Sequence, residues 1–154
     1  MKSHSREFII LAVVALVVAV LRFFMQGWVE SAGISARTGS FFASIDIVLL
    51  VGLVIIFVRE GIAAERRYTR AAAWFVLLTA WCTVLVIAGI LTTATTGATT
   101  YYQDTMSKPP PAPSHHAMMH AIAFVPMAVI GLILGAIIYW VAGLARRGKP
   151  ALAH

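Results

Sequence analysis

The chain has 154 residues, of which 60% are hydrophobic and only 12% are charged. Because soluble domains contain about 25% charged residues, this composition excludes a soluble globular protein and indicates an integral membrane protein. The formal net charge of +6 arises mainly from basic residues in short segments between apolar runs. That placement is typical of membrane orientation, so we expect no nucleic-acid partner. The single cysteine, Cys82, allows no intrachain disulfide.

The first half of the chain contains two apolar runs that are long enough to cross the hydrocarbon core of a bilayer. They lie at about residues 8–28 and 41–58. The first run reaches Trp28, a residue type that anchors helices at the membrane interface, and no small-x-small cleavage site follows its apolar core. We therefore expect this run to be retained as a span rather than removed as a signal peptide.

The second half predicts two more spans, at about residues 71–96 and 115–144. Threonines crowd the end of the third span, where their hydroxyl groups can bond to carbonyl groups of the preceding helical turn. The loop at residues 97–114 contains a proline-rich stretch that favours extended backbone. Ser114 is a suitable N-cap for the last helix. The whole chain, 1–154, is thus predicted to be one all-α domain with four transmembrane helices.

The distribution of basic residues predicts the orientation of the chain. Nine of them lie at the termini or between the second and third spans, whereas the opposite side holds only Arg37 and Lys108. Since cytoplasmic segments carry the excess of Lys and Arg, both termini are expected in the cytoplasm and the loop 97–114 outside it. Short connections favour antiparallel neighbours, which predicts an up-down-up-down bundle in a bacterial-type inner membrane. The nine basic residues are Lys2, Arg6, Arg59, Arg66, Arg67, Arg70, Arg146, Arg147 and Lys149.

Two ionisable residues lie inside the predicted spans at a similar depth. Arg22 lies about 9 Å before the end of the first span, and Asp46 lies about 8 Å after the start of the second. A charge at this depth costs on the order of a few kcal/mol unless it is paired or hydrated, so we expect an Arg22–Asp46 ion pair in the bundle interior. Such a pair either only locks two helices together or forms a polar site for an anionic headgroup, a quinone or a proton.

A cluster of histidines and methionines opens the last helix. His116 and His120 are four residues apart and share one helical face, which is how a helix presents two imidazoles to one metal ion. His115 and Met119 share a neighbouring face. Imidazole with thioether suits copper, and imidazole alone also suits zinc or a haem iron. The alternative interpretation is that these side chains are hydrated interfacial residues that bind no metal.

A haem held between two histidines of this one chain is disfavoured. The two histidines outside the cluster, His4 and His154, lie at the termini that are expected in the cytoplasm, on the opposite side of the membrane. A haem shared between this chain and a partner subunit stays open.

Small residues mark one face of the last span. Gly131 and Gly135 form a GxxxG pair, and Gly143 continues their face two turns further on. Small residues at this spacing let helix backbones approach closely, either within the bundle or at an interface with another subunit.

The sequence shows no nucleophile with a neighbouring base, no phosphate-binding glycine loop and no CxxC motif, so we expect a non-catalytic role. The leading prediction is a small accessory or assembly subunit of a larger inner-membrane complex, such as a respiratory or photosynthetic one. Its partners would be the lipid bilayer and other membrane subunits or copies of itself. One alternative is a metal- or haem-handling protein that uses the His/Met cluster. Another is a small oligomeric carrier or channel with Arg22 and Asp46 on its path.

Overall fold

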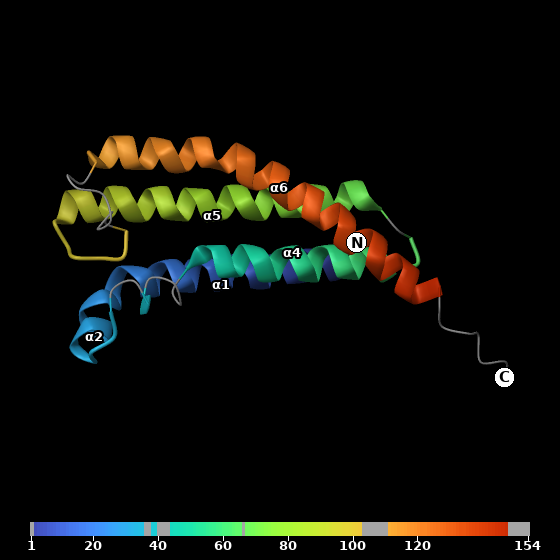
Figure 1. Cartoon of the computed structure of the whole chain (residues 1–154), viewed down its shortest axis with the longest axis horizontal. Coiled ribbons are helices and arrows are strands. Elements are labelled where there is room, and N and C mark those ends of the chain that lie inside the picture. The colour runs from blue at the N-terminus through green and yellow to red at the C-terminus, as the bar shows by residue number, and fades with distance from the viewer. Residues whose placement is uncertain (1, 36–37, 40–43, 66, 103–110, 148–154) are drawn as a thin grey trace.

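A computed structural model of the chain describes residues 2–35, 38–39, 44–65, 67–102 and 111–147. The described residues form helices and the turns that connect them, without any strand (Figure 1). The helices are α1 (Lys2–Phe24), α2 (Gln26–Ser31), α4 (Ile45–Ile62), α5 (Tyr68–Thr96) and α6 (Pro113–Arg147). The four long helices alternate in direction, so that α1 and α5 begin at the end of the molecule where α4 and α6 finish (Figure 1).

Three of these helices are long and apolar enough to cross a membrane. They contain the segments Arg6–Phe24, Tyr68–Thr96 and Pro113–Arg146. The second predicted span, at residues 41–58, corresponds to α4, which has 18 residues and carries three charged side chains, so it does not join this group. Residues 41–43, where that span was expected to begin, lie outside the described part of the chain. The three apolar helices indicate a membrane protein.

Local chemistry explains where several helices begin and end. The hydroxyl group of Ser44 accepts a hydrogen bond from the Asp46 N–H at 3.1 Å and thereby caps the start of α4. At the end of α5, Gly97 adopts a left-handed conformation with φ 67°, and its N–H donates to the Thr93 carbonyl at 2.9 Å. The last helix begins at Pro113, one residue before the predicted cap Ser114, because proline fits the first turn of a helix.

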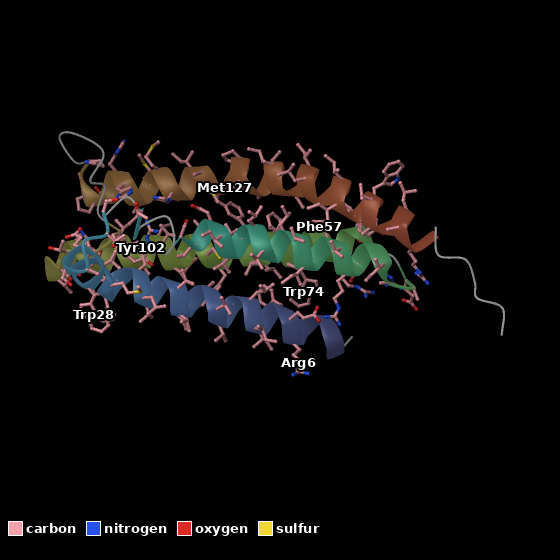
Figure 2. The ribbon with its side chains drawn as sticks, turned by 60° about the horizontal axis from the view of Figure 1, so that its bottom comes forward. Arg6, Trp28, Phe57, Trp74, Tyr102 and Met127 are labelled. Carbon is pink, nitrogen blue, oxygen red and sulfur yellow. The ribbon has the colours of Figure 1, made fainter. Side chains whose placement is uncertain are left out.

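The first span ends earlier than the sequence predicted. The long helix α1 stops at Phe24, and the chain continues into the six-residue helix α2. Trp28 therefore lies on α2 rather than at the end of α1, and its side chain is 77% exposed and points away from the bundle (Figure 2). The residue still suits an interfacial anchor, although a separate short helix carries it.

The core runs along the contact of α1, α4 and α5, with α6 packed across α4 and α5. Its buried residues include small side chains of α1, such as Ala15 and Ala19, and large ones such as Phe57 of α4 and Leu78 of α5. The outward faces of α1 and α6 are apolar as well and remain exposed, as at Ile133. A long helix that exposes apolar side chains along its length suits lipid surroundings, because contact between apolar side chains and lipid tails costs no free energy.

The last helix changes direction along its length (Figure 1). Pro126 lies inside α6, where its ring removes one backbone hydrogen bond and favours a kink. Beyond this point Gly131 faces Phe75 of α5, and Gly135 faces Phe57 of α4. The bend thus brings α6 from one neighbour onto the next.

Candidate functional site

Polar side chains gather at both ends of the bundle. The tyrosine end is the end that holds Tyr101 and Tyr102, together with Arg22, Asp46, His116 and His120. The glutamate end is the opposite one and holds Glu7, Arg59, Glu60 and Arg70. Figure 2 shows Tyr102 among the helices of the tyrosine end, far from Arg6 near the glutamate end.

At the tyrosine end, Arg22 attaches the chain that follows α5 to the end of α1. Its guanidinium donates a hydrogen bond to the Tyr101 carbonyl oxygen at 2.9 Å, and its central carbon lies 5.3 Å from the centre of the Tyr102 ring. The Tyr102 hydroxyl in turn donates to the carbonyl oxygen of Ala19 at 3.0 Å. Two tyrosines and one arginine therefore hold residues 97–102 against α1.

Threonines stabilise the same segment from the side of α5. The hydroxyl groups of Thr93 and Thr100 lie 2.8 Å apart and are buried. The Thr100 hydroxyl also accepts a hydrogen bond from the backbone N–H of Tyr102 at 3.1 Å. Burial of these hydroxyls without partners would cost free energy, so their mutual bonds allow a polar turn to sit inside the bundle.

The phenol of Tyr102 is strongly affected by this burial. The side chain is 4% exposed, and burial raises its pKa to about 12, against the opposing effect of the Arg22 charge. Tyr102 is therefore a neutral hydrogen-bond donor across the physiological pH range. In this pH range the Tyr102 side chain positions the backbone and does not exchange a proton.

The sequence predicted an ion pair between Arg22 and Asp46. Asp46 accepts a hydrogen bond from the Ser44 hydroxyl at 2.9 Å, and its side chain is exposed. The charges of Arg22 and Asp46 act on each other, and a direct ion pair between them stays a prediction. The charge of Asp46 also reaches His120 on α6. Arg22 of α1, Asp46 of α4 and His120 of α6 therefore lie near one another at the tyrosine end, where the polar layer was expected.

Two of the predicted metal-binding residues lie side by side. The ring centres of His116 and His120 are 5.1 Å apart, with the rings tilted by 49°. Both side chains are half-buried, whereas His115 is exposed and Met119 is 51% exposed. No three His, Cys, Asp or Glu side chains of the described chain come together as a group that could hold a metal. The structure therefore supplies a two-histidine pair, with His115 and Met119 outside it.

Gly131 and Gly135 of the last span lie against other helices of the same chain. A Cβ atom added to Gly131 would meet the Phe75 ring, and one added to Gly135 would meet the Phe57 ring. Gly143 is buried as well. For Gly131 and Gly135, the close approach occurs between α6 and its neighbours in this chain; an interface with another subunit stays a prediction.

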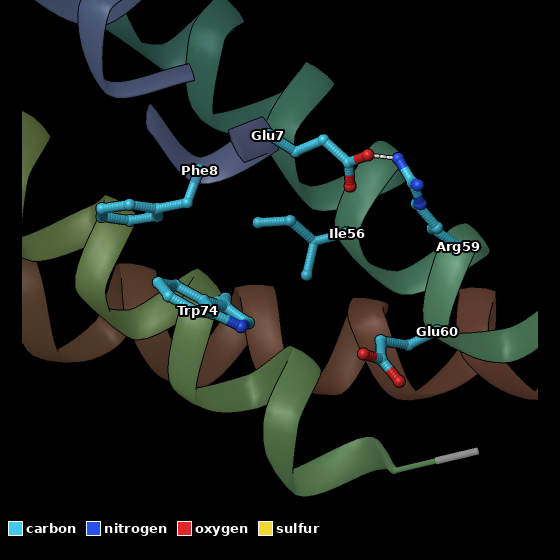
Figure 3. Close-up of a pocket in the computed structure, with 6 residues that line it drawn as sticks. All are labelled: Glu7, Phe8, Ile56, Arg59, Glu60 and Trp74. Atoms are coloured by element: carbon cyan, nitrogen blue, oxygen red, sulfur yellow. Dashed lines mark ion pairs between the residues drawn. The ribbon is translucent and has the colours of Figure 1, made fainter. Parts of the chain in front are cut away.

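The glutamate end holds a buried carboxylate that sequence reasoning missed. Glu60 is 1% exposed, and its carboxylate lies 3.6 Å from the guanidinium of Arg70 on α5. Nearby, Glu7 of α1 pairs with Arg59 of α4 (Figure 3). These two ion pairs connect α1 to α4 and α4 to α5.

A small pocket lies beside these ion pairs; it has room for little more than a water molecule and is partly open to the surroundings. Figure 3 shows the side chain of Trp74 between Phe8 and Glu60. The ring centres of Phe8 and Trp74 are 4.9 Å apart. The pocket therefore combines an aromatic wall with two carboxylates whose charges are balanced by arginines. Its lining residues are Glu7, Phe8, Ile56, Arg59, Glu60 and Trp74.

One sequence signal could have placed Glu60 in the core. Leu49, Leu53 and Phe57 are buried on α4, and Glu60 continues their spacing of three to four residues. The charged segment 59–70 was interpreted as a connection, but α4 extends to Ile62. Helical periodicity was therefore a better guide here than charge.

Comparison with protein-family models, with curated protein sequences and with solved structures finds no match for this chain. The functional argument therefore depends on its own residues.

Proposed function

We propose that the chain is a four-span inner-membrane protein with both termini in the cytoplasm, and that it serves as a small non-catalytic accessory or assembly subunit of a larger membrane complex. Besides the three apolar helices, α4 would be the remaining span. Its 18 residues extend about 27 Å, close to the thickness of the hydrocarbon core. Asp46 lies in its first turn and Arg59 in its last, where charges can reach the two interfaces.

The observation that carries the accessory role is the use of the buried polar groups. Arg22 and Tyr102 join the chain after α5 to α1, while Glu60 and Arg70 join α4 to α5. Tyr68 adds a bond from α5 to α6, because its hydroxyl donates to the Leu132 carbonyl at 2.9 Å. Polar groups that fix the helices relative to one another make the bundle rigid, while its outer surface stays apolar. A rigid bundle with an apolar surface suits a subunit that stabilises or positions its neighbours.

The orientation can be tested with single cysteines at the two ends of one helix. In a Cys82→Ser background, Glu65→Cys precedes α5 and Thr96→Cys ends it; both positions are exposed. A membrane-impermeant thiol reagent added to intact cells is expected to label Thr96→Cys and to leave Glu65→Cys unlabelled until the cells are opened. The reverse pattern would contradict the proposed orientation, and labelling of both in intact cells would contradict the membrane crossing of α5.

The accessory role can be tested by extraction of native membranes in a mild detergent. The chain, detected through an epitope tag, is expected to elute in a particle much larger than its own 16.6 kDa in detergent, with companions in fixed proportion. The control is the same chain produced in an unrelated host, where it should elute as a small species. If the chain from its own membranes also elutes alone or only with copies of itself, the proposal is wrong.

A further inference from the structure

The first turns of α6 carry a feature that the accessory role does not use. His116 and His120 lie on one face of a continuous helix, and their ring centres are 5.1 Å apart. A nitrogen–metal bond of about 2.0–2.1 Å puts a ring centre about 3 Å from the metal, so a tetrahedral angle separates two bound rings by about 5 Å. The observed spacing therefore suits two imidazoles bound to one ion.

A metal ion can reach the two imidazoles, and the negative charge of Asp46 lies near them. Both rings are half-buried, so each retains access from outside the bundle. Asp46 on α4 acts on His120 through space, and its negative charge offsets the positive charge of Arg22 that acts on the same ring.

The position along α6 keeps this pair outside the hydrocarbon. At 1.5 Å per residue, the 35 residues of α6 extend about 52 Å, more than the roughly 30 Å of the hydrocarbon core. If Tyr139 and Trp140 mark one interface, the other lies about 20 residues earlier, next to His120. Water and dissolved ions can therefore reach the imidazoles.

We propose that His116 and His120 form a two-imidazole chelate for a late divalent transition-metal ion, with Cu²⁺ bound more tightly than Zn²⁺. Imidazole suits both ions, and copper leads the order of affinity for a given set of nitrogen ligands. Two protein ligands leave positions for water or for a donor from another molecule, so the site is open rather than a closed structural one. This inference does not depend on the accessory role.

The test uses the full chain purified in detergent and stripped of metal, titrated with Cu²⁺ and then Zn²⁺ in a buffer that does not chelate. One Cu²⁺ per chain is expected, and the double variant His116→Ala/His120→Ala should weaken its binding at least tenfold. The matched control is His115→Ala, which removes the neighbouring exposed imidazole and should leave the affinity unchanged. Equal loss in His115→Ala, or unchanged binding in the double variant, would overturn the proposal.

A spectroscopic measurement separates the chelate from nonspecific binding. Electron paramagnetic resonance of the Cu²⁺-loaded chain should show coupling to imidazole nitrogens that is lost in His120→Ala. Circular dichroism of each variant checks that the helices remain, and His120→Gln provides a second variant of similar size should the alanine variant fail to fold. A Cu²⁺ spectrum that is the same in wild type and in His120→Gln would contradict the proposed ligand.

Discussion

The guanidinium of Arg22, near the end of α1, donates a hydrogen bond at 2.9 Å to the backbone carbonyl of Tyr101, 79 residues further along the chain. This bond and the adjacent Tyr102 ring make Arg22 the main polar link between the first helix and the segment after α5. A charged donor of this kind contributes more than a neutral one, because its electrostatic attraction to the carbonyl oxygen is stronger.

Replacement of Arg22 by Gln should therefore destabilise the folded chain by about 1.5–3 kcal/mol, the range for hydrogen bonds to charged groups. Tyr102→Phe is the matched variant, since it keeps the ring and removes only the hydroxyl that donates to Ala19; it should cost about 0.5–1.5 kcal/mol. Denaturant unfolding of the chain in detergent measures both. A free energy of unfolding for Arg22→Gln equal to that of wild type would show that the link carries no stability.

This link also shows how far the sequence could predict the site. Hydropathy placed the long helices, and the depth of Arg22 indicated that it needed a partner. The partner was expected on the next span, at Asp46, and nothing in the sequence indicated the bond that Arg22 makes to the backbone of Tyr101. A contact across 79 residues depends on how a turn folds back onto α1, and neither helical periodicity nor charge counting describes that.

At the glutamate end, sequence-based prediction failed for a different reason. Charge counting assigned Glu60 to a connection, because a charged residue is rarely buried without a partner. Arg70 supplies that partner from the following helix, so Glu60 can lie in the core. The partner becomes visible only when α4 and α5 are placed against each other.

The Glu60–Arg70 pair predicts a strong coupling in a double-mutant cycle. Glu60→Gln removes the counter-charge of the half-buried Arg70, and Arg70→Gln removes this counter-charge of the buried Glu60, so each should destabilise the chain, Arg70→Gln by as much as about 3 kcal/mol. The double variant should be more stable than the sum of the two losses predicts. The control is the exposed pair Glu65–Arg67, for which the same cycle should give no measurable coupling. Strict additivity at Glu60 and Arg70 would contradict a functional ion pair.

Gly135 predicts a steric effect between α6 and α4. In Gly135→Ala the new methyl group would meet the Phe57 ring, so the helices must separate or the ring must move, at a cost of about 1–3 kcal/mol. Gly27→Ala is the control, because nothing lies within 4 Å of the position of its Cβ, and it should be neutral or slightly stabilising.

The cause can be separated from a general loss of helix packing by a second change. The leucine side chain in Phe57→Leu is smaller than the native ring. Phe57→Leu should therefore recover part of the stability lost in Gly135→Ala, although it should be destabilising when introduced alone. If Gly135→Ala is as well tolerated as Gly27→Ala, then Gly135 is not required for the contact between α6 and α4.

The buried phenol of Tyr102 predicts a loss of stability in alkali. Its pKa is about 12 in the folded chain, whereas an exposed tyrosine in the unfolded chain titrates near 10. The folded state therefore holds this proton more tightly, and its stabilising effect is complete below about pH 10 and disappears as the pH rises to about 12. The stability of wild type should thus fall more steeply than that of Tyr102→Phe between these values. Other basic and phenolic groups titrate in both proteins, so the difference between the two unfolding curves isolates Tyr102. Parallel curves across this range would show that the phenol is not held in its neutral form by the fold.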